Sequence, residues 1–126
     1  MSTIKRPPFV LLIDDEHDTR SVWCMVLELE GITAMSAANG EDGLAKAITR
    51  IPDLIITDFM MPGIDGLEVC RRVRADERLH DVPLILWSAA RGIEARGIAD
   101  LVVEKPVQIE TMLLHVHSLV RGAGGV

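Results

Sequence analysis

Short apolar runs alternate along the chain with longer stretches in which apolar residues recur at helical spacing. The short runs are nearly continuous in Val, Ile and Leu, as in strands that are buried on both faces. In the longer stretches apolar side chains return every three or four residues, which is typical of the inner face of a helix. The expected strands are residues 9–13, 32–36, 54–58, 84–88 and 101–103, and the expected helices are residues 18–30, 41–50, 67–75 and 109–121.

The first expected helix shows the helical pattern most fully. Its core-filling stripe has apolar residues at i, i+3, i+4 and i+7, namely Val22, Met25, Val26 and Leu29. Three apolar neighbours widen this stripe: Trp23, Cys24 and Leu27. Asp18 in this helix and Asp65 before the third helix are expected to act as caps. In the third helix Arg71, Arg72 and Arg74 are expected to form a solvated face.

The strict alternation of strands and helices predicts a parallel sheet with right-handed crossovers and helices on both faces. The fold class is therefore α/β, a doubly wound three-layer sandwich. One connection departs from the pattern, because residues 91–100 include Gly92 and Gly97, and each glycine costs roughly 1 kcal/mol in a helix interior. We expect at most about two loosely held turns there, so the helix between the fourth and fifth strands is shortened.

The composition suits one globular domain. The chain has 126 residues, of which 48% are apolar, and this is long enough to bury a core. We expect a single domain over residues 1–126, with a loose polar leader at residues 1–8 and a flexible tail at residues 122–126. The initial Met1 and the loose tail favour a complete protein over an excised domain.

The charge and the cysteines narrow the range of partners and compartments. A formal net charge of -6 and a pI near 5.1 argue against direct binding of nucleic acid, which needs a basic face. The apolar runs are shorter than ~18 residues and the start lacks a signal peptide, so we expect neither a membrane span nor secretion. Cys24 and Cys70 fall in different helices without a Cys-x-x-Cys spacing, which favours reduced thiols and a cytoplasmic location.

Chemically active side chains follow four of the expected strands. Asp14 and Asp15 come after the first strand, Asp58 ends the third, Ser88 ends the fourth and Lys105 follows the fifth. Because the carboxyl ends of parallel strands share one edge of the sheet, these groups should converge there. Converging carboxylates repel one another unless a cation neutralises them, and Mg²⁺ is the hard, oxygen-binding ion that suits them. The first strand is not followed by a glycine-rich phosphate loop, which excludes dinucleotide and Walker-type nucleotide sites.

The same groups suit phosphoryl transfer. A carboxylate beside a divalent ion can attack phosphorus and form an aspartyl phosphate, while the metal, a lysine and a hydroxyl share the charge on the transferring oxygens. Simpler explanations exist for the single residues, since Asp15 could cap the first helix, Lys105 could be a surface lysine and Ser88 could be an ordinary strand-end hydroxyl. The full set in this order favours the chemical explanation.

Over essentially its whole length the chain resembles the receiver domain of two-component response regulators, of the single-domain type found among chemotaxis regulators. The resemblance rests on four motifs in the right order: Asp14-Asp15 after the first strand, Asp58 with Met61-Pro62-Gly63 and Gly66 behind it, Ser88-Ala89 after the fourth strand, and Lys105-Pro106 after the fifth. It implies a flavodoxin-like fold with a five-stranded parallel sheet in the order 2-1-3-4-5.

The resemblance also implies the roles of the site residues. Asp58 would be the phosphoacceptor, Ser88 would bind a phosphoryl oxygen and Lys105 would pair with the phosphoryl group. Four groups would hold Mg²⁺: the carboxylates of Asp14, Asp15 and Asp58 and the backbone carbonyl of Met60. Of these, Asp15 would bind the ion directly and Asp14 would hold one of its waters.

Two features depart from the family pattern. Val102 stands three residues before Lys105, where family members usually have an aromatic residue that turns inward on phosphorylation. The interval from Ser88 to Lys105 is also shorter than usual, which again indicates a short helix before the fifth strand. These elements build the usual output face of the family, so the resemblance leaves the downstream protein open.

The favoured function is a phosphorylation-dependent switch that receives its phosphoryl group from a histidine kinase or phosphotransfer protein and acts by contact with another protein. As a monomer or weak dimer, it would catalyse only its own phosphorylation and dephosphorylation. One alternative is a Mg²⁺-dependent phosphohydrolase with an aspartyl nucleophile, but that class has a cap insertion and a second acid where this chain has Met60. Another is a receiver fold that docks without phosphate, which the complete set of acids, hydroxyl and lysine disfavours.

Overall fold

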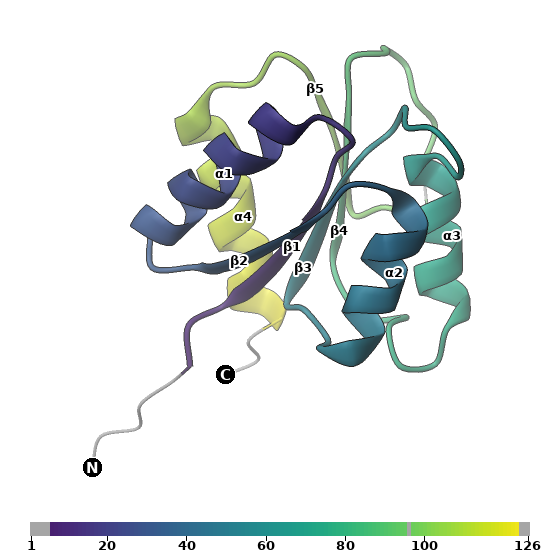
Figure 1. Ribbon diagram of the computed structural model, residues 1–126, viewed down its shortest axis with the longest axis horizontal. Coiled ribbons are helices and arrows are strands. Elements are labelled where there is room, and N and C mark those ends of the chain that lie inside the picture. The colour runs from purple at the N-terminus through teal and green to yellow at the C-terminus, as the bar shows by residue number, and fades with distance from the viewer. Residues whose placement is uncertain (1–5, 96, 124–126) are drawn as a thin grey trace.

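The computed structural model describes residues 6–95 and 97–123, and its elements follow the predicted order (Figure 1). The strands are β1 (Phe9–Ile13), β2 (Thr33–Ala37), β3 (Leu54–Asp58), β4 (Leu84–Ser88) and β5 (Leu101–Glu104). The helices are α1 (His17–Leu29), α2 (Gly40–Thr49), α3 (Gly66–Ala75) and α4 (Ile109–Ala123). Most element ends fall within one or two residues of the predicted ones, as is common for such boundaries.

The five strands form one parallel sheet in the order β2-β1-β3-β4-β5, which confirms the flavodoxin-like topology. Helices α1 and α4 cover one face of the sheet and α2 and α3 cover the other (Figure 1). Every residue of β1, β3 and β4 is buried, because helices cover both sides of these central strands. The parallel pairing places the carboxyl ends of the strands along one edge.

The core consists of two clusters, one on each face of the sheet. Successive residues of a strand belong to opposite clusters, because side chains alternate between the faces. On β3, Ile55 packs in the cluster that includes Val69 of α3, whereas Ile56 packs in the cluster that includes Leu27 of α1 and Val116 of α4. The sheet is therefore packed from both sides, and this packing fixes the positions of its strand ends.

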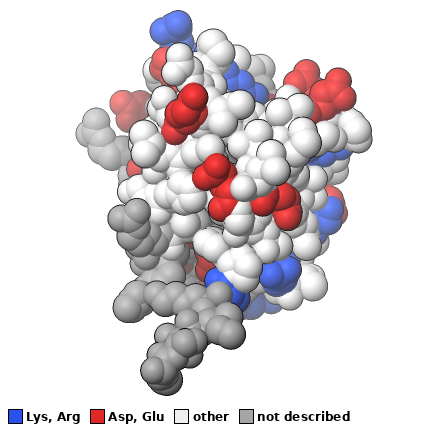
Figure 2. Space-filling view, turned by 90° about the vertical axis from the view of Figure 1, so that its left-hand side faces the viewer, with Lys and Arg blue, Asp and Glu red and all other residues white. Residues whose placement is uncertain are grey.

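The apolar stripe predicted for α1 is partly wrong. Val22, Met25 and Leu29 are 47%, 58% and 80% exposed, whereas Leu27 is buried and Trp23 packs against the core cluster on that face. Apolar residues extend almost around this helix, so periodicity alone does not determine which face is buried. The indole of Trp23 packs edge-to-face on a second tryptophan, in β4, and this contact turns Trp23 inward. The side of the molecule that carries α1 has broad areas without charged side chains (Figure 2).

Only one of the two predicted helix caps is present. Asp65 caps α3, since its carboxylate accepts a hydrogen bond from the amide of Glu68 at 2.8 Å. Asp18 does not cap α1, because the helix begins one residue earlier, at His17, and Glu16 occupies the capping position. The side chain of Asp18 is almost fully exposed.

The connection between β4 and β5 has no α-helix in its described residues, 89–95 and 97–100. The carbonyl of Ala95 closes one turn, since it accepts the amides of Ile98 and Ala99 at 3.0 Å each. This corrects the shortened helix expected from the sequence. Gly92 and Gly97 both adopt positive φ, at 72° and 79°, a conformation that interrupts a right-handed helix.

Arg74 of α3 anchors this connection and does not belong to a solvated face, contrary to the prediction. Its guanidinium donates to the carbonyls of Ile98, His80 and Val82 at 2.8, 2.9 and 2.7 Å. It also pairs with the carboxylate of Asp100 at 2.9 Å. One side chain thus joins α3 to the segments on both sides of β4.

Both ends of the described chain are attached to the domain. Residues 1–5 of the expected leader lie outside the described residues, but Arg6 donates two hydrogen bonds to Asp53, at 2.8 and 2.9 Å. Helix α4 continues to Ala123, into the expected tail, and residues 124–126 lie outside the described residues. Within the part of the chain that is described, no helix is long and apolar enough to cross a membrane.

The two cysteines lie in different helices, as predicted. Cys24 in α1 is half-buried and Cys70 in α3 is fully buried, and both are free thiols. Burial raises the pKa of the Cys70 thiol to about 12. Cys70 is therefore a core residue with little thiolate character at neutral pH.

Candidate functional site

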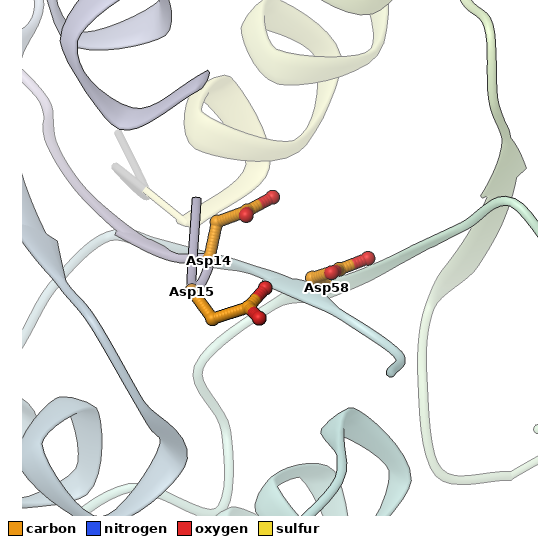
Figure 3. Close-up of side chains that lie close together, drawn as sticks. All are labelled: Asp14, Asp15 and Asp58. Atoms are coloured by element: carbon orange, nitrogen blue, oxygen red, sulfur yellow. The ribbon is translucent and has the colours of Figure 1, made fainter. Parts of the chain in front are cut away.

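The acid cluster lies where β1 and β3 end side by side (Figure 3). The two strands pair with Ile13 opposite Thr57, so the next residues, Asp14 and Asp58, leave neighbouring strands at the same edge. Asp15 follows directly. One carboxylate oxygen from each of the three acids lies within 4.8 Å of the others. The acidic strand ends therefore meet, as the parallel topology requires.

The three acids differ in burial and in charge environment. Asp14 is 1% exposed and Asp58 is 8% exposed, whereas Asp15 is open to solvent. The pKa of Asp58 lies above its usual value, and burial is the largest cause. The charges of Asp14 and Asp15 also raise this pKa, whereas the hydrogen bond and the charge of Lys105 lower it. The ionised form of Asp58 is therefore stabilised by any cation that enters the cluster.

Lys105 reaches the acid cluster from the segment after β5. Its Nζ lies 3.1 Å from Oδ1 of Asp58 and 3.5 Å from Oδ2 of Asp14. Its backbone amide donates to the carbonyl of Ser88 at 2.8 Å, which fixes this segment beside the end of β4. Among the described residues this ammonium is the one paired with the cluster, and it lies against two of the three carboxylates, so negative charge is in excess there.

The acid cluster fits a hard divalent cation. Its grouped donors among the described residues are all carboxylate oxygens, the ligands that Mg²⁺ prefers, and the group includes no thiolate or imidazole. Two of the acids are buried and oriented by the fold, while Asp15 leaves the cluster accessible from solvent. Mg²⁺ usually keeps several waters, and an open side of this kind suits such a site.

The backbone after Asp58 is held tightly. The amide of Phe59 donates to Oδ1 of Asp58 at 3.0 Å and to the carbonyl of Trp87 at 2.9 Å, and its carbonyl accepts the amide of Gly66 at 2.7 Å. Gly66 packs so closely on the carbonyl of Asp58 that a Cβ atom there would collide with it. The glycine at this position therefore lets α3 begin directly against the end of β3.

Ser88 and Met60 come from strand ends beside the acid cluster, but within the described residues neither makes a hydrogen bond to its carboxylates. Ser88 is buried at the end of β4, where its Oγ accepts the amide of Ala90 at 2.9 Å. Met60 is the second residue after Asp58, and 67% of its surface is exposed. The expected roles of the Ser88 hydroxyl and the Met60 carbonyl stay predictions.

Trp87 is a neighbour of the site that the sequence pattern does not reveal. Nζ of Lys105 lies over its indole ring, 4.7 Å from the ring centroid. The ring also packs on Trp23, with centroids 5.2 Å apart and planes at 87°. Its place directly before Ser88, in a strand that pairs with β3, is the signal that could have indicated it.

Comparison with known proteins identifies the family. The family model of the response regulator receiver domain matches residues 10–117, a span that includes every site residue described above. The chain belongs to this family. Receiver domains of response regulators are signalling switches of two-component systems, so the resemblance expected from the sequence is confirmed.

Individual relatives match almost all of this receiver domain. It is 40% identical over 121 residues to the transcriptional regulatory protein AfsQ1 of Streptomyces coelicolor. The aligned region covers 90% of this chain and 52% of AfsQ1. The chain spans about half the length of the curated relatives it matches. The chemotaxis protein CheY4 of Vibrio cholerae has a TM-score of 0.83 at 27% identity, covering 90% of this chain and 98% of CheY4. The response regulator TrrA of Thermotoga maritima, solved in complex with Mg²⁺-BeF, has a TM-score of 0.81 at 32% identity. The superposition covers 89% of this chain and 98% of TrrA.

Proposed function

We propose that this receiver domain is a phosphorylation-dependent switch of a phosphorelay and that Asp58 accepts the phosphoryl group. The observation that carries the proposal is the cluster of Asp14, Asp15 and Asp58, with the Lys105 ammonium 3.1 Å from Asp58. The donor is a phosphohistidine of a histidine kinase or phosphotransfer protein. A carboxylate oxygen of Asp58 bonds to phosphorus, the bond between phosphorus and the histidine nitrogen breaks, and the product is an aspartyl phosphate.

The three carboxylates of the acid cluster, with the backbone carbonyl of Met60, would hold Mg²⁺. When bound, the ion offsets negative charge on the carboxylates and on the transferring oxygens. The chain orients two of these carboxylates by backbone hydrogen bonds: the amide of Phe59 donates to Asp58 at 3.0 Å and the amide of Glu16 donates to Asp14 at 2.8 Å. The Mg²⁺-BeF complex of the relative TrrA supports this choice of ion.

Lys105 and Ser88 would stabilise the transferred group. The Lys105 ammonium lies beside the carboxylate that gains the phosphoryl group, so a short movement lets it pair with phosphoryl oxygens. The Ser88 Oγ accepts the amide of Ala90, and its own hydrogen stays free to donate to a phosphoryl oxygen. Displacement of either side chain changes contacts at the ends of β4 and β5, which links phosphorylation to conformation.

Intact-mass measurement tests the proposal directly. After incubation with acetyl phosphate and Mg²⁺, the wild-type protein should gain the mass of one phosphoryl group, and Asp58→Asn should gain none. Excess chelator should abolish the gain in the wild type. The same mass increment in Asp58→Asn, or undiminished labelling in chelator, would contradict the assignment of Asp58 and of the ion.

We also propose that residues 1–126 form one domain whose output is contact with another protein, as a monomer or weak dimer. Hydrolysis of external substrates is disfavoured, because an exposed methionine, Met60, stands where aspartyl phosphohydrolases have their second acid. The two functions differ in stoichiometry. Repeated turnover of a small phosphate ester such as p-nitrophenyl phosphate would favour the enzyme, and a single phosphorylation per chain supports the switch.

A further inference from the structure

Trp87 occupies the sheet position next to the phosphoacceptor candidate. β3 and β4 pair with Asp58 opposite Trp87, and residues opposite each other in paired strands project from the same face. The Trp87 side chain is buried, with 4% of the residue exposed. Since Nζ of Lys105 lies 4.7 Å from its ring centroid, the ammonium that pairs with Asp58 also rests on this ring.

A tryptophan is an unusual choice for filling this part of the core. Its Nε1 is buried and has no hydrogen-bond partner among the described residues. A buried donor without a partner destabilises the folded state, and an apolar ring such as that of phenylalanine would avoid this cost. Two contacts favour an aromatic ring here, the edge-to-face contact with Trp23 and the cation–π contact with Lys105. For the second of these, tryptophan has the most favourable ring.

The Trp87 ring restricts the position of the Lys105 ammonium more than the two carboxylates do alone. Lysine has a flexible four-carbon stem, and the Lys105 side chain is 26% exposed, so the two carboxylates at 3.1 and 3.5 Å leave its ammonium free to turn toward solvent. The Trp87 ring gives the ammonium a third contact beside those with Asp14 and Asp58. Three contacts define one position for the charge.

We propose that Trp87 is a positioning residue: its ring holds the Lys105 ammonium beside Asp58 before and during the transfer of the phosphoryl group. This rests on the proposed phosphorylation of Asp58. It also gives the chain an aromatic group that responds to the lysine, although Val102 replaces the aromatic residue usual for the family. Val102 packs with the cluster on the α2 and α3 face, whereas Trp87 belongs to the cluster on the α1 and α4 face.

The contact itself can be tested without any phosphoryl donor. In ¹H–¹⁵N spectra, Lys105→Met should shift the indole N–H resonance of Trp87, because the substitution removes the charge but keeps a long side chain. Lys46→Met is the matched control, since Lys46 lies on α2, across the sheet, where its ammonium bonds to the Ser36 carbonyl at 2.8 Å. A Trp87 resonance that is equally indifferent to both substitutions would overturn the proposal.

The positioning role is tested by initial rates of phosphorylation with acetyl phosphate and Mg²⁺. Trp87→Leu should slow the reaction by roughly 3- to 30-fold, the range expected for loss of a partly desolvated cation–π contact. Trp87→Phe should restore part of the rate, because phenylalanine keeps a weaker ring contact. Trp23→Leu removes the same kind of side chain from the same indole pair without touching Lys105, and should stay within about twofold of wild type.

Equal slowing in Trp87→Leu and Trp23→Leu would show that Trp87 only fills the core, and so would a Trp87→Phe rate no better than that of Trp87→Leu. If Trp87→Leu fails to fold, Trp87→Phe carries the comparison, and a rate equal to wild type would then overturn the role. Failure of the wild type to accept any phosphoryl group would overturn the proposed function instead. The shift of the Trp87 resonance in Lys105→Met separates failure of the positioning role from failure of the proposed function, because it reports the contact between Trp87 and Lys105 without any phosphoryl donor.

Discussion

Asp53 shows how much one side chain contributes to attaching the start of the chain to the sheet. Its carboxylate accepts two hydrogen bonds from Arg6, at 2.8 and 2.9 Å, and one from the amide of Phe9 at 2.7 Å. Burial alone would raise the pKa of Asp53, but these hydrogen bonds and the charge of Arg6 outweigh burial and lower it. The ionised form of Asp53 therefore stabilises the folded protein.

This predicts a specific pH dependence. Because the pKa of Asp53 is lower in the folded than in the unfolded state, its contribution is present above the unfolded value of about 3.9 and is lost as pH falls through the folded value. Asp53→Asn should lower the free energy of unfolding by about 1–3 kcal/mol at pH 7, and the difference should narrow below about pH 4. Urea unfolding at both pH values measures it. Asp81→Asn, at an exposed carboxylate, is the control, and a difference that persists unchanged in acid would contradict the pKa assignment.

At the level of single residues, the sequence predicts the site acids better than it predicts the partners of long side chains. Asp14 and Asp58 could be placed from topology alone, because parallel strands end at one edge. Arg74 and Trp87 could not. Their partners come from segments distant in sequence, and the contacts depend on strand register and on the direction each side chain takes, which a pattern of apolar and polar positions does not contain.

Among the elements, the connection between β4 and β5 is where the structure departs from the helix predicted by the sequence. Arg91, Gly92 and Glu94 are exposed, whereas Ala95 is buried and the segment after it is bonded to Arg74. The first part of the connection is therefore mostly exposed, whereas the second part is anchored by Arg74. Local unfolding should begin in the first part.

Hydrogen exchange tests this division. In the unphosphorylated protein the described amides of residues 91–94 should exchange quickly, those of Ile98 and Ala99 should exchange more slowly, and phosphorylation should slow exchange across residues 91–100 as Ser88 moves. Arg74→Gln should speed exchange at Ile98 and Ala99 by roughly tenfold or more, since it removes the hydrogen bonds that the guanidinium donates to three backbone carbonyls.

The matched control for Arg74→Gln is Arg71→Gln, on the same helix, because within the described part of the chain the Arg71 guanidinium makes one polar contact, a long and exposed one with Glu68 at 3.5 Å. This control should leave exchange in the connection unchanged. Slow exchange throughout residues 91–100 that is indifferent to phosphorylation would show that the segment does not respond to the site.

Helices and strands were predictable to different degrees. The strands follow from continuous apolar runs, since residues buried on both faces leave little ambiguity. The inner face of helix α1 does not, because apolar side chains surround most of the helix, and tertiary contacts of Trp23 and Leu27 select that face. The irregular path between β4 and β5 follows from Gly92 and Gly97, but the sequence overstated its helicity, because it does not show that both glycines adopt positive φ.

In the molecule as a whole, the site lies at an edge that both layers of helices share. Lys105 contacts Asp58 from the end of β5, and its backbone amide bonds to the end of β4, so a change at the acid cluster reaches two strands at once. Any ligand that binds two conformations with different affinity shifts their populations. The lysine is the group best placed to make that difference in this domain.

Lys105→Ala should therefore still accept a phosphoryl group but should respond to it more weakly. With beryllofluoride and Mg²⁺, amide shift changes in the wild type should extend from the acid cluster into β4, β5 and the connection between them, whereas those of Lys105→Ala should stay close to Asp58. Retention of the full spread of shift changes in Lys105→Ala would mean that another group provides the link.

The indole pair beside the site also determines the optical properties of the protein. The chain has two tryptophans and no tyrosine, and the two indoles lie edge-to-face with centroids 5.2 Å apart, one of them beneath Lys105. Almost all of its ultraviolet emission and most of its near-ultraviolet circular dichroism must then arise from this one place. The intrinsic fluorescence and near-ultraviolet circular dichroism of the unlabelled protein should therefore report changes at the sheet edge that carries the acid cluster. Binding of ions and reaction with phosphoryl donors can then be followed in real time without any substitution.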